Sequence, residues 1–340
     1  MATPADTYTL PDLHSICPWR TSLNPHHEAV AAESSAWILS YDVQAKLGVS
    51  QKLLDFFISR GGSLLCAYTY PFATPELLRI ACDFTNLLFL IDEVCDVQNG
   101  VGVRQTAQSV LCALKNEAYD DNSVLYKMTE DFMKHLMVFA GSNADTLGRF
   151  LQHFTSYLHA LNEEADHRDE SNVLDVVAYN ALRREFGGAQ CSLDLIGFMI
   201  GGDLPNVVLE HPAFQKMHYA AVDMVTWAND LYSYDMEKLM GHTTNIIPVL
   251  QHERGLSLQE AVDFAGSHWR ELVEEFEKAK KELPSFGEDL DPIITKYING
   301  METTAAGNLD WSFETLRYFG ADRERVRDTL VVHLSPRKGF

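Results

Sequence analysis

Three acidic residues, Asp92, Glu93 and Asp96, follow directly on the apolar run Leu-Leu-Phe-Leu-Ile over residues 87–91. Asp92 and Asp96 are four positions apart, so on an α-helix both carboxylates project from one face, about one turn from each other. Like charges at this spacing repel, and burying them is unfavourable unless a cation neutralises them. Because Mg²⁺ is commonly held by one or two protein carboxylates, with water and phosphate oxygens completing its shell, the pattern predicts a divalent-cation site. A solvated acidic helix end is the alternative for this stretch taken alone.

A second stretch carries oxygen donors at helical spacing. Asn229, Ser233 and Glu237 occupy positions i, i+4 and i+8, which places an amide oxygen, a hydroxyl and a carboxylate on one helix face. Such a trio is suited to one Mg²⁺ ion, although mid-helix Asn and Ser are also common as solvent-facing groups. Two oxygen-rich stretches in one chain favour the metal hypothesis for both.

Composition narrows the class of function. The 340 residues are 46% hydrophobic and carry a net charge of −21, which argues against binding nucleic acid or an anionic membrane. Six cysteines are scattered with no CxxC pair, as expected of reduced thiols in a cytoplasmic protein. The sequence shows neither a signal-peptide pattern nor a long apolar run, so we expect no membrane insertion.

The elements that must position these residues are helices. Residues 1–24 contain three prolines and are expected to form an irregular arm, residues 25–320 a single helical domain, and residues 321–340 a C-terminal tail. Ser257 and Glu260 form the pattern of a capping box. The Gly187-Gly188 pair predicts a break between two helices. Helices are expected over 25–45, 50–60, 75–97, 103–116, 122–139, 143–168, 172–186, 189–200, 211–239, 257–282, 292–299 and 302–319. An all-α bundle with a site in its core is therefore predicted.

With these motifs the chain resembles the class I terpene cyclases, and more closely the microbial sesquiterpene synthases. D-E-x-x-D at 92–96 and N-D-x-x-S-x-x-x-E-K at 229–238 match the two metal motifs of that family. The family's diphosphate-sensing arginine corresponds to Arg183, and its Arg-Tyr pair to Arg317-Tyr318. The resemblance implies a single-domain helical fold with the active site in the bundle core, and a monomer or homodimer.

A narrower resemblance is to basidiomycete fungal enzymes of secondary metabolism that cyclise through a humulyl cation, such as Δ6-protoilludene synthases. It rests on Leu10-Pro11-Asp12-Leu13 with Cys17-Pro18-Trp19, on the segment 92–100, and on Asp203-Leu204-Pro205. It implies 1,11-closure of farnesyl diphosphate as the first ring-forming step.

The family resemblance assigns roles to the metal motifs. It implies three Mg²⁺ ions, with Mn²⁺ able to replace them, that neutralise the diphosphate and make it a good leaving group. Asp92 is expected to hold two ions and Asp96 to assist one turn further on. The third ion is expected to be bound by Asn229, Ser233 and Glu237.

The remaining roles concern the diphosphate and the hydrocarbon chain. Arg183, Lys238, Arg317 and Tyr318 are expected to donate to diphosphate oxygens, and Gly187 to be the effector at the helix break. The family's polar linker is replaced here by Phe186, which leaves the relay to Gly187 open. Phe89 and Trp311 are the candidates for aromatic faces that stabilise carbocations, with ordinary core packing as the alternative. Phe89 shares a helix face with Asp92, and Trp311 is placed seven residues before Tyr318 on one helix.

The sequence thus predicts a Mg²⁺-dependent sesquiterpene synthase, a carbon–oxygen lyase that converts farnesyl diphosphate to a cyclic hydrocarbon or alcohol. A prenyl diphosphate synthase is one alternative, but it requires a second aspartate-rich motif that is absent here. A non-catalytic helical scaffold is the other, and it would bind no diphosphate with metal.

Overall fold

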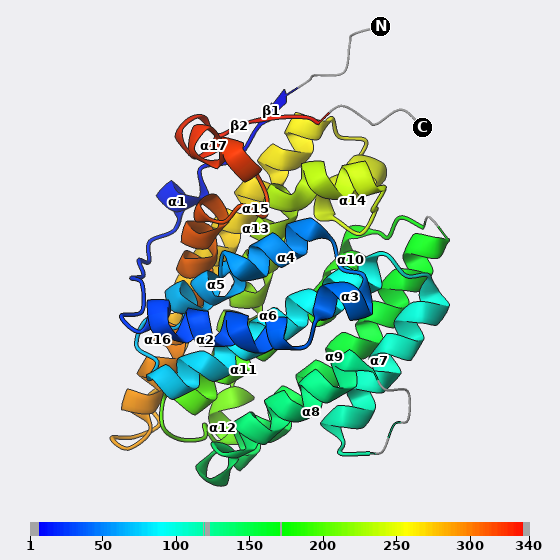
Figure 1. Cartoon of the computed structure of the whole chain (residues 1–340). Helices are drawn as coiled ribbons and strands as arrows, with labels where there is room; N and C mark the ends of the chain where they lie inside the picture. The colour runs from blue at the N-terminus through cyan, green and yellow to red at the C-terminus, as the bar shows by residue number, and fades with distance from the viewer. Residues whose placement is uncertain (1–6, 118, 120–122, 171, 336–340) are drawn as a thin grey trace, which may run out of the picture.

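In the computed structural model the chain is almost entirely helical, which confirms the predicted all-α class (Figure 1). The structure describes residues 7–117, 119, 123–170 and 172–335, so the first six residues of the predicted arm and the last five of the tail lie outside it. Its helices are α1 (Leu13–Ile16), α2 (His27–Ser40), α3 (Val43–Leu47), α4 (Gln51–Ile58), α5 (Gly61–Thr69), α6 (Pro75–Asp96), α7 (Gly100–Leu114), α8 (Val124–Met137), α9 (Ala144–Asp169), α10 (Val176–Phe186), α11 (Ala189–Met199), α12 (Asn206–Leu209), α13 (Pro212–Met240), α14 (Ile246–Arg254), α15 (Leu258–Glu282), α16 (Asp291–Glu314) and α17 (Arg323–Thr329), with 3₁₀ turns at Ala140–Ser142 and Gly320–Asp322.

Helix boundaries follow local chemistry in most places. Ser257 accepts from the backbone of Glu260 while the Glu260 carboxylate accepts from the backbone of Ser257, so the predicted capping box is confirmed. The expected split into 292–299 and 302–319 is wrong, because α16 is one continuous helix that ends at Glu314. The sequence patterns also failed to indicate α5 and α14. Both are short, nine-residue helices whose stability comes from tertiary packing.

Two long helices form the centre of the bundle. α6 packs against α2, α5, α8 and α11, and α13 packs against α10, α14, α15 and α16. Both are buried along most of their length, and large side chains such as Phe84 and Trp227 are enclosed within this core. The two predicted metal motifs therefore lie at the C-terminal ends of two central helices.

The ends of the described chain meet in a small sheet. β1 (Thr7–Thr9) pairs antiparallel with β2 (Val331–His333), with Tyr8 opposite Val332. Figure 1 shows both strands beside α17 at one end of the bundle. Part of the predicted arm is thus an ordered strand that fastens the segment after α17 to the body.

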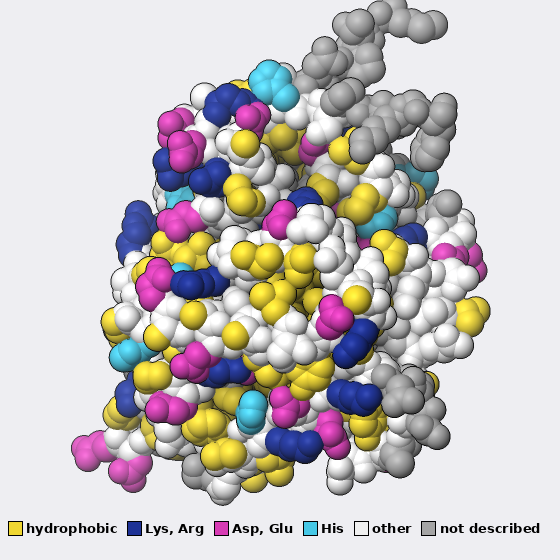
Figure 2. All heavy atoms as spheres, viewed as in Figure 1, with side chains coloured by type: hydrophobic (Ala, Val, Ile, Leu, Met, Phe, Trp, Pro, Cys, Tyr) yellow, Lys and Arg dark blue, Asp and Glu magenta, His cyan; other side chains and the backbone are white. Residues whose placement is uncertain are grey.

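On the face drawn in Figure 2, acidic and basic side chains are interspersed, and this face shows no broad basic patch of the kind that binds nucleic acid. Among the residues that the structure describes, no helix is long and apolar enough to cross a membrane. The six cysteines are all buried and free.

Candidate active site

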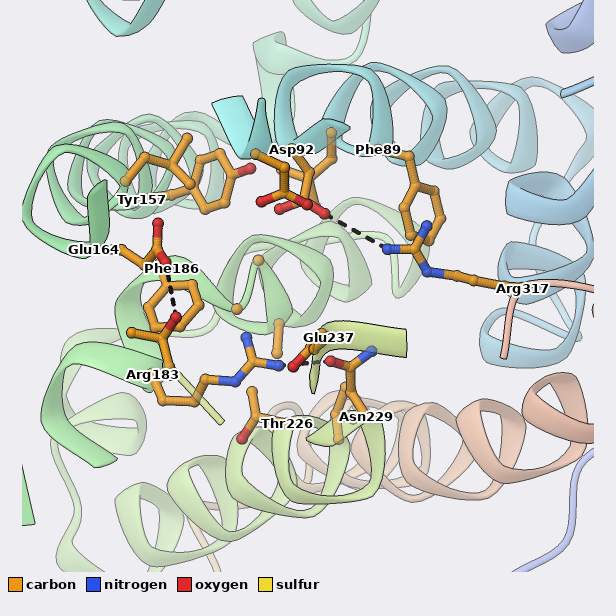
Figure 3. Close-up of a pocket in the computed structure, with 18 of the residues that line it drawn as sticks. Phe89, Asp92, Tyr157, Glu164, Arg183, Phe186, Thr226, Asn229, Glu237 and Arg317 are labelled. Carbon is orange, nitrogen blue, oxygen red and sulfur yellow. Dashed lines mark hydrogen bonds and ion pairs between the residues drawn. The ribbon is translucent and has the colours of Figure 1, made fainter. Parts of the chain in front are cut away.

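α6 presents the first motif. Thr74 caps the helix by accepting from the backbone N–H of Leu77, and Pro75 occupies the first turn. Asp92 and Asp96 both line one cavity, as their spacing predicted, and Phe89 lies beside them on the same wall (Figure 3). Burial and, next in effect, the neighbouring Asp92 carboxylate together raise the pKa of Asp96 to about 9.

α13 presents the second motif on the opposite wall. Asn229 and Glu237 line the cavity, while Ser233 between them is buried and donates its hydroxyl to the carbonyl oxygen of Asn229 at 2.8 Å. Burial and, next in effect, the nearby Asp230 carboxylate raise the pKa of Glu237 to about 7, although the hydrogen bond from Asn245 acts in the opposite direction. Asn245 holds the Glu237 carboxylate at 2.9 Å.

The two motifs face each other across a cavity of about 180 Å³ (Figure 3). Side-chain oxygens that could bind a metal ion line its walls at one end, and the rest of the lining is mainly apolar. The apolar and aromatic lining residues include Leu65, Leu88, Phe89, Leu161, Phe186, Val225 and Trp311. A polar end that carries the charge and an apolar interior beyond it suit a substrate with an anionic head and a hydrocarbon body.

Arg183 extends from α10 to the rim of this cavity. Its Nη2 donates to Asn229 Oδ1 at 2.7 Å and its Nε donates to Asp230 Oδ1 at 3.0 Å. Asp230, 1% exposed, also accepts from the hydroxyl of Tyr179 and from the backbone N–H of Ile246. Asp230 thus fixes a buried guanidinium next to the second motif, and its negative charge raises the pKa of Arg183.

The predicted helix break is confirmed. α10 ends at Phe186, Gly188 adopts a left-handed conformation with φ +68°, and α11 begins at Ala189. Gly187 lines the cavity, and a Cβ atom there would lie 2.7 Å from Thr226 Cγ2 and 2.8 Å from the carbonyl oxygen of Arg183. Only glycine fits between α10 and α13 at this position.

Arg317 and Tyr318 lie in the turn after α16, not on a helix as expected from the heptad spacing to Trp311. The turn nevertheless brings all three to the cavity, with the Trp311 and Tyr318 rings edge to face at 5.5 Å. The Tyr318 hydroxyl accepts from Asn229 Nδ2 at 2.7 Å. Arg317 lies 4.7 Å above the Phe89 ring and forms an ion pair with Asp92 at 3.6 Å.

Lys238 differs from the other predicted residues. It follows Glu237 on α13, and one residue turns the helix by about 100°, so it points away from the cavity. Its ammonium lies 5.6 Å from the centre of the Tyr234 ring, and it is not among the cavity-lining residues. The structure therefore does not bring Lys238 to the other candidates.

Sequence reasoning missed a polar wall contributed by α9. Glu164 is 7% exposed, accepts from Arg168 at 2.8 Å and from Thr244 at 2.7 Å, and lines the cavity. Tyr157, seven residues earlier, lies on the same face. His242 also lines the cavity, and burial lowers its pKa. A buried acid on an otherwise apolar helical face was the available signal.

The donor set suits a hard divalent cation. Asp92, Asp96, Glu164 and Glu237 bring four carboxylates to one cavity, and carboxylate oxygens are the ligands that such a cation prefers. Within the described part of the chain, no three His, Cys, Asp or Glu residues gather closely enough to hold a metal without other ligands.

Comparison with known proteins gives a consistent result. Residues 83–275 match the family model described as "Terpene synthase family 2, C-terminal metal binding". A Cyclocybe aegerita protein named "Bifunctional terpene synthase Agr4" is 38% identical, covering 97% of this chain and 94% of its own. "Sesquiterpene synthase 1" of Postia placenta is 35% identical over 97% of this chain and 95% of its own. A Coprinopsis cinerea protein 41% identical over 99% of this chain and 95% of its own carries the different name "Linoleate 10R-lipoxygenase COP4".

Solved structures show the same fold. Germacradien-4-ol synthase from Streptomyces citricolor superimposes with a TM-score of 0.76 at 21% identity, covering 88% of this chain and 97% of its own. Linalool/nerolidol synthase from Streptomyces clavuligerus gives a TM-score of 0.74 at 21% identity, covering 87% of this chain and 98% of its own.

Proposed function

We infer the function from the premise that this chain belongs to the terpene synthase family, as a fungal-type class I enzyme. This membership confirms the resemblance seen in the sequence, and the family is one of divalent-metal-binding enzymes that act on prenyl diphosphates. We propose that the protein is a sesquiterpene synthase that ionises farnesyl diphosphate with three Mg²⁺ ions. One observation carries the proposal: two oxygen-rich motifs face each other across the charged end of a cavity whose remaining lining is mainly apolar.

The residues that would bind metal lie on two helices. Asp92 and Asp96 on α6 would hold metal on one wall, and Asn229, Ser233 and Glu237 on α13 would hold it on the other. When bound, the metal neutralises the diphosphate and so favours departure of the leaving group. This chain itself contributes the fixed positions of the metal-binding side chains, because α6 and α13 are both packed in the core.

Arg183, Arg317 and Tyr318 supply hydrogen-bond donors at the same end. Arg183 is held by Asp230, so its guanidinium is oriented before the substrate arrives. Arg317 forms its ion pair with Asp92 through only one terminal nitrogen, and its Nε makes no hydrogen bond. That donor remains for a diphosphate oxygen.

Beyond the metal motifs the apolar part of the cavity lining keeps bulk water away from the cation. Phe89 and Trp311 lie 6.1 Å apart between ring centres, and both line the cavity. Aromatic faces stabilise a nearby cation by about 0.5–2 kcal/mol each, which steers the course of cyclisation without causing ionisation. We assign both rings this role. The free buried cysteines support a cytoplasmic location for the reaction.

The test is product analysis. Purified protein is incubated with farnesyl diphosphate, with Mg²⁺ or with a chelator, and the organic extract is analysed by gas chromatography and mass spectrometry. A Mg²⁺-dependent sesquiterpene, lost in Asp92→Asn but retained in the matched surface variant Asp55→Asn, is expected. The ring skeleton of the product tests 1,11-closure.

Other substrates define the alternatives. Geranyl and geranylgeranyl diphosphate test the preferred chain length, and linoleate in air tests the activity in the name of the Coprinopsis relative. A folded protein that turns over none of the three diphosphates, or that oxygenates linoleate instead, would contradict the proposal.

A further inference from the structure

An asparagine in the cavity lacks a hydrogen-bond partner for its amide nitrogen. Asn308 lies on α16, one turn before Trp311, lines the cavity and is only 4% exposed. Its Nδ2 atom is buried and donates no hydrogen bond. Buried polar groups are as a rule paired with protein or with ordered water, so an unpaired amide at the wall of a cavity indicates a ligand.

Two further polar side chains, Thr85 on α6 and Ser192 on α11, line the same cavity. Both are tied to the end of α5. The Cys66 thiol donates to Thr85 Oγ1 at 3.1 Å, and the Tyr70 hydroxyl donates to the carbonyl oxygen of Ser192 at 2.7 Å. Thr85 is thus joined to α5 through its hydroxyl, and α11 is joined to the end of α5 through the backbone of Ser192.

The residue before Asn308 contacts the same segment of α5. Gly307 packs so closely on α5 that an added Cβ would lie 2.7 Å from the carbonyl carbon of Tyr68. Thr85, Ser192 and Asn308 line the cavity from three different helices, each of which contacts residues 66–70 at that residue or the one before it, and we call these three side chains the polar floor.

The polar floor lies away from the site of ionisation. Thr85 is seven residues before Asp92 on α6, and at 1.5 Å per residue this separates them by about 10 Å along the helix. Leu88 and Phe89 lie between them on the cavity wall. A hydrocarbon chain held by its diphosphate at Asp92 extends over these apolar groups toward the floor.

The floor offers both donors and acceptors. Thr85 accepts from a thiol and keeps its own hydroxyl hydrogen for another partner. Ser192 donates to the carbonyl oxygen of Gly188 at 3.3 Å, which leaves its oxygen as an acceptor. With the amide of Asn308, these groups supply the two to four partners that a buried water needs. The cavity of about 180 Å³ greatly exceeds the roughly 10–15 Å³ that one water requires.

We propose that the polar floor binds one water molecule that captures the final carbocation, so that the product is a sesquiterpene alcohol. The inference rests on the proposed function and narrows its product class. A lone pair of the water oxygen forms a C–O bond to the cationic carbon, and the resulting oxonium ion loses one proton. Farnesyl diphosphate and water are thereby converted to an alcohol and hydrogen diphosphate, which takes up that proton, with no change in oxidation state.

Tyr157 provides a useful comparison. Its hydroxyl also lines the cavity without a hydrogen-bond partner, but Figure 3 shows it directed toward Asp92, at the diphosphate end. A water there would meet the diphosphate and metal ligands before the cyclised cation. Tyr157→Phe is therefore expected to leave the share of alcohol in the product unchanged.

The experiment follows the origin of the hydroxyl oxygen. Wild-type enzyme, farnesyl diphosphate and Mg²⁺ are incubated in ¹⁸O-labelled water, and the products are resolved by gas chromatography and mass spectrometry. We expect an alcohol labelled with ¹⁸O. In Asn308→Leu the ratio of alcohol to hydrocarbon should fall by about tenfold, the effect of one lost hydrogen bond on a branching step. In Asn308→Gln, which keeps the amide, the ratio should fall less.

Controls separate the outcomes. Asn162→Leu makes the same change on α9 outside the cavity lining and should not alter the ratio. If Asn308→Leu does not fold, Thr85→Val provides the same test with an isosteric side chain. A wild-type product that is solely hydrocarbon, or an unlabelled alcohol, overturns the proposal while the synthase function stands. An unchanged ratio in Asn308→Leu or in Thr85→Val also overturns it. No product from any diphosphate overturns both proposals.

Discussion

Two neighbouring arginines of α10 make matched ion pairs with α13, and they differ in burial. Arg183 pairs with Asp230, with side chains 10% and 1% exposed, whereas Arg184 pairs with Asp223, with side chains 34% and 6% exposed. Replacing each aspartate by asparagine removes the same charge from the same helix. The structure predicts very different consequences.

Asp230→Asn leaves a guanidinium buried without its counter-charge. Removing one partner of a buried pair costs about 3–5 kcal/mol. The new amide nitrogen must also face other donors, either Arg183 Nε or the Tyr179 hydroxyl together with the backbone N–H of Ile246. In Asp223→Asn, Arg184 is one-third exposed and still stacks on the Tyr219 ring, so water replaces the carboxylate and the loss is about 1 kcal/mol.

The functional effects should diverge more strongly. Asp230 orients Arg183 toward Asn229, and a displacement of about 1 Å in a positioned catalytic group lowers the rate by roughly 100-fold. Asp223→Asn should keep near wild-type turnover, because the Arg184–Asp223 pair lies outside the cavity lining.

Urea unfolding followed by circular dichroism, and kcat/KM for farnesyl diphosphate, measure the two effects. Inhibition by inorganic diphosphate adds a readout of the anion site that does not depend on cyclisation. Equal unfolding midpoints for the two variants, or wild-type turnover and diphosphate inhibition in Asp230→Asn, would refute the assignment of Asp230 as the residue that positions Arg183.

Three further predictions concern the same cavity. Gly187→Ala should lower turnover by about 100-fold, because the new methyl group would lie within 3.0 Å of Thr226 and of the backbone of residue 183. Adding Thr226→Ser to this variant removes only the side-chain clash and should restore activity only in part. Full restoration in steady-state assays would contradict the backbone clash. In metal-free protein, the raised pKa values of Asp96 (about 9) and Glu237 (about 7) mean that the folded state binds more protons than the unfolded chain, so stability should fall as the pH rises from about 4 to about 9. Mg²⁺ should accordingly raise the melting temperature more at about pH 8 than at about pH 5, and equal shifts in a thermal-unfolding series would be inconsistent with this. Lys238→Ala should change kcat/KM by no more than about threefold, since its ammonium contacts an aromatic ring outside the cavity; a loss of 100-fold would mean that Lys238 reaches the diphosphate after all.

The sequence by itself determined those features that depend on spacing within one helix. Asp92 with Asp96, and Asn229 with Glu237, share helix faces because a period of 3.6 residues fixes side-chain direction wherever the helix forms. The Gly187-Gly188 pair likewise marked the break between α10 and α11, since the left-handed conformation at residue 188 is accessible to glycine.

Tertiary structure alone decided which helix faces meet. No local pattern indicates that Asp230 holds Arg183, that Glu164 reaches the loop after α13 through Thr244, or that Asn308 lies in the cavity. Arg183 and Asp230 are 47 positions apart in the sequence, and Glu164 and Thr244 are 80 apart. These contacts, like the position of Asn308, follow from how α9, α10, α13 and α16 pack around the core. Side-chain periodicity specifies the buried face of each helix but not its neighbour, because the hydrophobic effect that drives the packing is non-directional.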